Sequence, residues 1–107
     1  MATRETKIRT RTQEGLIEVL VLVNHPMETG MRKDKASGKV VPQHFIKEMT
    51  LEHNGKVVAV AHMGPAVSEN PLIGFRLKGA KSGDKVKAAW SDNKGESGVA
   101  EAVVDAG

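Results

Sequence analysis

Four histidines are the conventional metal-binding or catalytic side chains of this chain: His25, His44, His53 and His62. Imidazole binds metal ions and exchanges protons near neutral pH, so a histidine-bound metal is the sharpest chemical hypothesis that they offer. In the strand pattern described below, His44 opens one strand, His53 precedes a turn and His62 ends another strand. We therefore expect the histidines to scatter across both ends of the fold, as ordinary surface or edge residues that bind no metal.

Hydroxyl and carboxylate side chains do not suggest a catalytic centre either. Ser68, Glu69 and His62 could be imagined as a nucleophile, an orienting group and a base, but the chain has no Gly-x-Ser-x-Gly turn. The glycine-containing segment from Gly79 to Gly83 does not precede a helical pattern, so it is not a phosphate-binding loop. The sequence predicts no catalytic residue and no cofactor.

Cysteine is absent, which excludes disulfides, thiolate metal ligands and a cysteine nucleophile. The net charge of +3 comes from 16 basic and 13 acidic residues that are dispersed along the chain. This distribution disfavours nucleic acid and favours an acidic protein partner or an anionic substrate. No apolar run is long enough for a membrane span, and residues 1–15 lack the apolar core of a secretory signal. Taken alone, these features predict a soluble cytoplasmic protein.

Apolar and polar residues alternate over short runs, and no segment keeps the spacing of an amphipathic helix. Ile73, Phe75 and Leu77, for example, alternate with polar residues or glycine, which places one face in a core and the other in water. With 107 residues, the chain has the size of one domain. We predict an all-β fold, an immunoglobulin-like antiparallel β-sandwich of about seven strands over residues 1–107, with a small barrel as the alternative. The expected strands are residues 7–12, 16–24, 44–53, 56–63, 72–78, 85–91 and 98–104.

The segment Leu16 to Val23 is nearly all apolar apart from Glu18, which predicts a central strand covered on both faces. The chain has only three aromatic residues, so its core must consist mostly of aliphatic side chains and methionine. Such a sandwich leaves at least one strand edge to protect and gains stability from a partner. We expect a heterodimer with an apolar interface, or self-pairing of the isolated chain.

One connection is much longer than the others. Asn54-Gly55 predicts a two-residue hairpin, whereas residues 25–42 form a long segment between two expected strands. Long loops in compact domains often carry function. Its charged run Arg32-Lys33-Asp34-Lys35 is consistent with a docking surface or with a solvated loop tip.

Three short motifs resemble superoxide reductases, which are immunoglobulin-like domains with a mononuclear iron centre. The motifs are His25-Pro26-Met27, His44-Phe45-Ile46 and Asn54-Gly55-Lys56. That family binds iron through four histidines and one cysteine thiolate, and this chain has no cysteine. We interpret this similarity as shared sandwich architecture. A free-standing domain that binds a metal or another ligand remains the alternative function.

A longer resemblance is to the SoxZ family of the bacterial sulfur-oxidation system, over about residues 16–104. Its most specific part is Leu22 to Arg32, which contains His-Pro-Met-Glu-Thr-Gly-x-Arg. Further matches are Gly38-Lys39-Val40-Val41-Pro42, Phe45-Ile46, Asn54-Gly55, Pro65-Ala66-Val67-Ser68-Glu69-Asn70-Pro71 and Trp90-Ser91-Asp92 followed by Gly95. The length of the chain and its lack of cysteine also fit this family.

The SoxZ resemblance implies a non-catalytic subunit of the SoxYZ carrier, in which a cysteine in the tail of SoxY holds sulfur derived from thiosulfate. It implies a SoxY-like partner in a heterodimer, transient contact with other Sox enzymes, and no nucleic acid or membrane. It also replaces the cytoplasmic expectation with the periplasm, reached by co-export with SoxY. As partner-binding residues we predict His25, Pro26, Met27, Glu28, Thr29, Gly30, Arg32, Lys33, Asn70 and Pro71. Which surface faces SoxY is not evident from the sequence.

Overall fold

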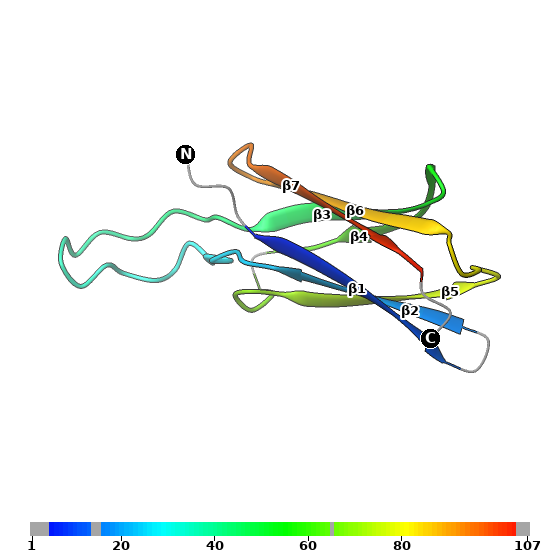
Figure 1. The fold of residues 1–107 in the computed structure, drawn as a ribbon. Helices are drawn as coiled ribbons and strands as arrows, with labels where there is room; N and C mark the ends of the chain where they lie inside the picture. Colours follow the sequence, from blue (N-terminus) through cyan, green and yellow to red (C-terminus); the bar gives the residue numbers. More distant parts are fainter. Residues whose placement is uncertain (1–4, 14–15, 65, 105–107) are drawn as a thin grey trace.

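Seven strands form two antiparallel sheets that pack face to face in the computed structural model, which describes residues 5–13, 16–64 and 66–104 (Figure 1). Each strand agrees with its expected position to within two residues. The prediction of an immunoglobulin-like sandwich is confirmed, and the chain does not form the alternative barrel. The strands are β1 (Thr6–Gln13), β2 (Leu16–Val23), β3 (Ile46–His53), β4 (Lys56–His62), β5 (Leu72–Lys78), β6 (Lys85–Asp92) and β7 (Ser97–Val103).

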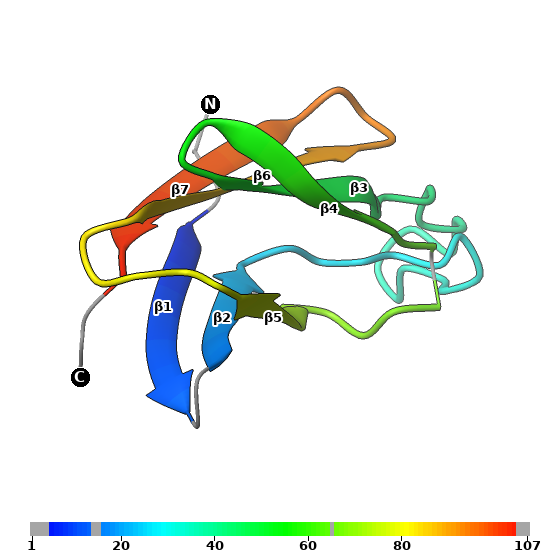
Figure 2. The ribbon, with the colours of Figure 1, turned by 90° about the vertical axis from the view of Figure 1, so that its right-hand side faces the viewer.

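The strand order is β1-β2-β5 in one sheet and β4-β3-β6-β7 in the other (Figure 2). The hairpin between β3 and β4 turns at Asn54 and Gly55, whose φ angles are 52° and 85°. Both residues tolerate positive φ at low cost, so the hairpin predicted from this pair is confirmed. The described residues contain no helix, and therefore none that is long and apolar enough to cross a membrane.

The core lies between the two sheets and is built from alternate residues of their strands. Aliphatic side chains and methionine dominate it, as the composition predicted. Trp90 is the one buried residue among the described Phe and Trp side chains, and its indole N–H donates to Oγ1 of Thr6 at 2.9 Å. The buried apolar residues are Ile17, Val19, Val21, Val23, Met27, Ile46, Met49, Leu51, Val86, Ala88, Trp90 and Val104.

Strand β2 is the middle strand of its sheet, as predicted, but only one of its faces is covered. Val19, Val21 and Val23 on the inner face are fully buried, whereas Leu22 on the outer face is 39% exposed. The expectation of cover on both faces is therefore wrong for the chain by itself. The cause is the number of layers: two sheets give each strand one inner face, and the described residues form no third layer on the outside.

Between β2 and β3, residues 24–45 leave the sandwich as a long arm that projects from one end (Figure 1). Isolated bridges join Glu28 to His44 at the base of this arm and Lys33 to Val40 further out. The two legs of the arm therefore run side by side. All residues from 31 to 40 are exposed.

Candidate functional site

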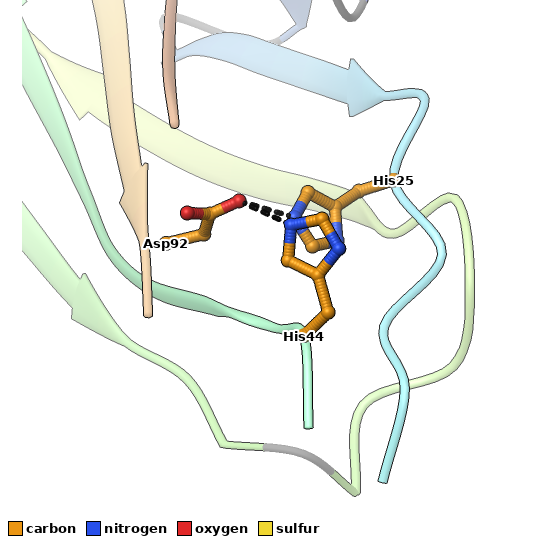
Figure 3. A group of neighbouring side chains, drawn as sticks. All are labelled: His25, His44 and Asp92. Atoms are coloured by element: carbon orange, nitrogen blue, oxygen red, sulfur yellow. Dashed lines mark hydrogen bonds and ion pairs between the residues drawn. The ribbon is translucent and has the colours of Figure 1, made fainter. Parts of the chain in front are cut away.

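The base of the arm contains a buried cluster of three polar side chains, His25, His44 and Asp92 (Figure 3). His25 follows the end of β2, His44 precedes β3, and Asp92 is the last residue of β6. Nε2 of His25 lies 2.9 Å from Oδ2 of Asp92, and Nε2 of His44 lies 2.7 Å from the same oxygen. One carboxylate oxygen therefore holds both legs of the arm.

The hydrogen bonds of His25 fix its tautomer. The backbone N–H of Met27 donates to Nδ1 of His25 at 3.1 Å, so that nitrogen is an acceptor and the ring proton lies on Nε2. Nε2 then donates to Asp92. The side-chain oxygen of Asn70 accepts the backbone N–H of His25 at 3.1 Å, and the Asn70 N–H donates to the His25 carbonyl at 2.8 Å. His25 is thus held through both its ring and its backbone.

Asp92 accepts hydrogen bonds on both carboxylate oxygens. Its Oδ1 accepts the backbone N–H groups of Lys94 at 3.0 Å and Glu96 at 2.8 Å, while Oδ2 faces the two imidazoles. Burial of the carboxylate opposes ionisation, but the hydrogen bonds from His25, Glu96, His44 and Lys94 outweigh it and hold the pKa of Asp92 below its usual value. The ionised carboxylate is the form that this network stabilises.

His44 is the member of the cluster that is nearest to solvent. Its Nε2 lies 3.0 Å from Oε2 of Glu96 as well as 2.7 Å from Asp92, so this nitrogen faces two carboxylates and must carry a proton. The His44 side chain is 8% exposed and that of Glu96 is 28% exposed. The network therefore reaches the surface through Glu96.

The donor set does not fit a metal ion, although the three ligand-type atoms lie within 4.8 Å of one another. Binding through Nε2 of His25 would require its ring proton to move to Nδ1, which faces the N–H of Met27. Two donors would then point at each other, whereas a metal-bound histidine normally donates from its second nitrogen to an acceptor. The arrangement is chemically a hydrogen-bonded clamp.

The expected scatter of the four histidines is wrong in part. His25 and His44 meet at the end of the sandwich from which the arm projects. His53 lies at the opposite end, where its Nε2 is 2.8 Å from Oδ2 of Asp84, and His62 is exposed on β4. The pairing of His25 with His44 depends on the path of the arm, which leaves β2 and returns to β3 at the same end, and alternation of residue types does not specify that path.

A second ion pair braces the arm just beyond its base. Nε of Arg32 lies 3.1 Å and 3.2 Å from the two carboxylate oxygens of Glu28. The hydrogen bond from Arg32 lowers the pKa of Glu28 and the same bond raises the pKa of Arg32. At the arm tip, the carboxylate of Asp34 accepts the backbone N–H of Ala36 at 3.0 Å. The arm therefore has internal order although its side chains are exposed.

The predicted partner-binding residues fall into two groups. Those that are buried do not present a side chain to a partner: His25, Met27 and Pro71. Those that are exposed or half-buried are available at the surface: Pro26, Glu28, Thr29, Gly30, Arg32, Lys33 and Asn70. The fold brings Asn70 against His25, so the two predicted segments lie side by side. That they bind a partner stays a prediction.

Sequence reasoning assigned no role in the site to Asp92 or Glu96. Asp92-Asn93-Lys94-Gly95 has the composition of a polar turn, and Gly95 does turn there with a φ of 82°. The available signal was an aspartate that ends an apolar strand and starts a glycine-containing turn. That pattern is common at solvated turns, so it does not indicate that Asp92 is only 2% exposed.

Comparisons with known proteins give one family and a set of similar folds. The family model described as the sulphur oxidation protein SoxZ matches residues 6–103. A superoxide reductase (neelaredoxin) from Archaeoglobus fulgidus in the reduced form is 22% identical, with a TM-score of 0.63 over 96% of this chain and 89% of that chain. A hypothetical protein from Pyrococcus horikoshii is 18% identical, with a TM-score of 0.61 over 95% of this chain and 89% of that chain. No curated protein gives a significant match. At these identities the two structures show a shared fold.

Proposed function

Because the chain belongs to the SoxZ family of sulphur oxidation proteins, we propose that it is the non-catalytic subunit of a SoxYZ-type sulphur carrier. In this proposal a SoxY-like partner bears the cysteine to which the sulphur intermediate is attached. The observation that carries the proposal is that this chain belongs to a sulphur-oxidation family and contains no cysteine. Thiolate is the nucleophile that attacks sulphur, so a chain without it leaves this chemistry to another molecule.

The proposed contribution of this chain is a rigid support with one projecting recognition element. The clamp formed by Asp92, His25 and His44 ties both legs of the arm to the end of β6. An arm that is already ordered loses little conformational entropy when it binds, which favours recognition. We assign the arm to contact with the partner or with the Sox enzymes that act on the carrier.

The proposed location is the periplasm, reached by co-export with a SoxY-like chain that carries the export signal. This part of the proposal follows from membership of the family. Expression of the chain with and without its partner, followed by fractionation, is the direct test. Efficient periplasmic delivery of the chain alone would contradict co-export.

Reconstitution tests the carrier role. The chain is mixed with a SoxY-like protein, purified as a complex, loaded with thiosulfate by the cognate enzymes, and analysed by intact mass spectrometry. The added mass should appear on the partner and should be absent when the partner cysteine is replaced by serine. A covalent sulphur adduct on this chain, or the lack of any complex with SoxY-like proteins, would overturn the proposal.

A further inference from the structure

The outer face of the β1-β2-β5 sheet has an apolar centre that this chain leaves uncovered. Leu22 on β2 is 39% exposed and Leu72, its register partner on β5, is 61% exposed. Leu20, one row further along β2, lies against Gly74 of β5, with its Cδ2 only 3.5 Å from the position of a Cβ there. We call Leu20, Leu22 and Leu72 the leucine face. Its residues are adjacent and so form one continuous patch.

The side chains around the leucine face are mostly basic, with Glu18 as an acidic member that lies between Arg11 and Arg76 in register. On β1, Lys7 pairs in register with Leu22 and Arg9 pairs with Leu20. On β5, Arg76 and Lys78 continue the same face beyond Gly74. Among the described residues, Arg9, Arg76 and Lys78 form no ion pair, whereas Arg11 is paired with Glu18 at 2.7 Å and Lys7 with Glu5 at 3.2 Å. Arg9 and Lys78 have leucines as register partners on β2, so a binding partner with an acidic rim would supply the opposite charges that they lack.

Two hollows lie on or beside this face. One, of about 270 Å³, is lined by Lys7, Arg9, Leu20, Leu22 and Leu72. The other, of about 220 Å³, shares Lys7 and Leu22 with the first and extends along Asn24 to Asn70. A hollow with apolar walls and a basic rim suits one large apolar anchor side chain. The second hollow connects the leucine face to the base of the arm.

The outer face of the β4-β3-β6-β7 sheet is built differently. Its exposed valines lie on the edge strands, for example Val60 on β4 and Val99 on β7, and the register places Thr50 and Ala89 between them. Acidic and basic residues are mixed on this face, such as Glu52, Lys87 and Glu101. This face has neither a leucine centre nor a mostly basic rim.

Area sets how far an interface on the leucine face must extend. Three strands about 26 Å long at a spacing of about 4.8 Å give a flat area of roughly 400 Å². A standard interface covers about 800 Å² on each partner. The sheet face alone supplies about half of this area, so a stable interface must continue past Asn24 and Asn70 onto the arm.

From these observations we infer that the SoxY-like partner binds the outer face of the β1-β2-β5 sheet. The partner inserts an apolar side chain between Leu20, Leu22 and Leu72, places carboxylates opposite Arg9 and Arg76, and continues along Asn70 to the arm. This inference rests on the proposed function. It explains why the outer face of β2 carries Leu20 and Leu22: the inner face packs in the core of this chain and these leucines pack against the partner.

Paired substitutions on the two outer faces test the assignment. Leu22→Glu with Leu72→Glu changes the leucine face, and Val60→Glu with Val99→Glu makes the same chemical change on the opposite sheet. Binding of each variant to a SoxY-like chain is measured by calorimetry, after circular dichroism has shown a native fold. The leucine variant should bind at least 100-fold more weakly than the wild type, and the valine variant within threefold of it.

Arg9→Glu with Arg76→Glu provides a second test that leaves the apolar side chains intact. It should slow association at least tenfold at low salt and reduce the salt dependence of the rate. Failure of the wild type to bind would sink the proposed function itself. If the leucine and the arginine variants both bind the SoxY-like chain as tightly as the wild type, the placement of the interface is wrong but the proposed function stands. The same holds if the substitutions weaken only the self-association of the isolated chain, because a second copy of this chain would then cover the face.

Discussion

Nε2 of His25 lies 2.9 Å from Oδ2 of Asp92, and both side chains are fully inaccessible to solvent. The contact joins residues that are 67 positions apart in the chain. It fixes the first leg of the arm to the end of β6, and the contact of His44 with the same oxygen fixes the second leg.

Replacing Asp92 with asparagine should lower the free energy of unfolding by about 2–4 kcal/mol. The reason is that the N–H₂ group of the amide must face either the two imidazole N–H groups or the backbone N–H groups of Lys94 and Glu96, and all of these are donors. Urea unfolding of the isolated chain measures this change. Glu101→Gln on the exposed part of β7 is the matched control and should change stability by less than about 0.5 kcal/mol. An equally small effect of Asp92→Asn would show that the clamp is not structural.

Acid should destabilise the chain partly through Asp84, whose pKa is lowered from 3.8 to about 2 by the backbone N–H of Lys81 and the side chains of His53 and Asn54. The unfolded chain takes up this proton first as pH falls. The stabilisation that ionised Asp84 gives to the folded chain is therefore complete above about pH 4 and is lost progressively toward pH 2. Asp84→Asn should flatten the pH dependence of unfolding in this window. Wild-type and variant curves that run parallel from pH 6 to 2 would contradict the assignment.

Gly98→Ala should destabilise the sandwich by about 1–3 kcal/mol through overpacking. A Cβ at position 98 would lie 2.7 Å from Cε2 of Trp90 and 2.8 Å from Oγ1 of Thr6. Gly74→Ala is the matched control, since its Cβ would meet only Leu20, at an ordinary 3.5 Å. Thermal melts of the two variants should separate clearly. Equal melting temperatures would mean that Trp90 and Thr6 can move to accept the added methyl group at position 98 at little cost.

Reversing the charges of Arg32 and Lys33 should slow association with the SoxY-like partner several-fold at low salt and leave the fold intact. Most of this effect should come from Lys33, because the charge of Arg32 is already opposed by Glu28. Stopped-flow mixing of single and double variants measures the rates. Lys56→Glu with Lys85→Glu, at the opposite end of the sandwich, is the control. Unchanged pairing and unchanged turnover of the complete Sox system would mean that the arm is only a solvated connection.

Purified protein should contain no stoichiometric iron or zinc, and its melting temperature should be the same with and without a chelator. The reason is the donor N–H of Met27 at Nδ1 of His25, which opposes the tautomer that metal binding through Nε2 requires. Elemental analysis after dialysis against each metal is the measurement. One tightly bound ion per chain, lost in both His25→Ala and His44→Ala, would favour a metal-binding domain.

Local rules were enough to predict the strands and turns from the sequence. Alternation with a period of two identifies Ile73, Phe75 and Leu77 as one face of β5 whatever the strand packs against. Asn54-Gly55 specifies its own hairpin because the positive φ angles are a property of those two residues. The long connection between β2 and β3 was equally visible, as a charged segment without alternation.

Tertiary structure alone decided where the polar residues of the arm base meet and which apolar face is exposed. His25, His44 and Asp92 come from three separate segments, and their burial depends on hydrogen bonds that exist only after those segments have converged. Strand β2 is apolar on both faces in the sequence, and alternation cannot say which side the chain covers. The arrangement of the strands in two sheets decides which face of β2 is covered, because a two-layer sandwich covers one face of each strand and leaves Leu22 and Leu72 at the surface.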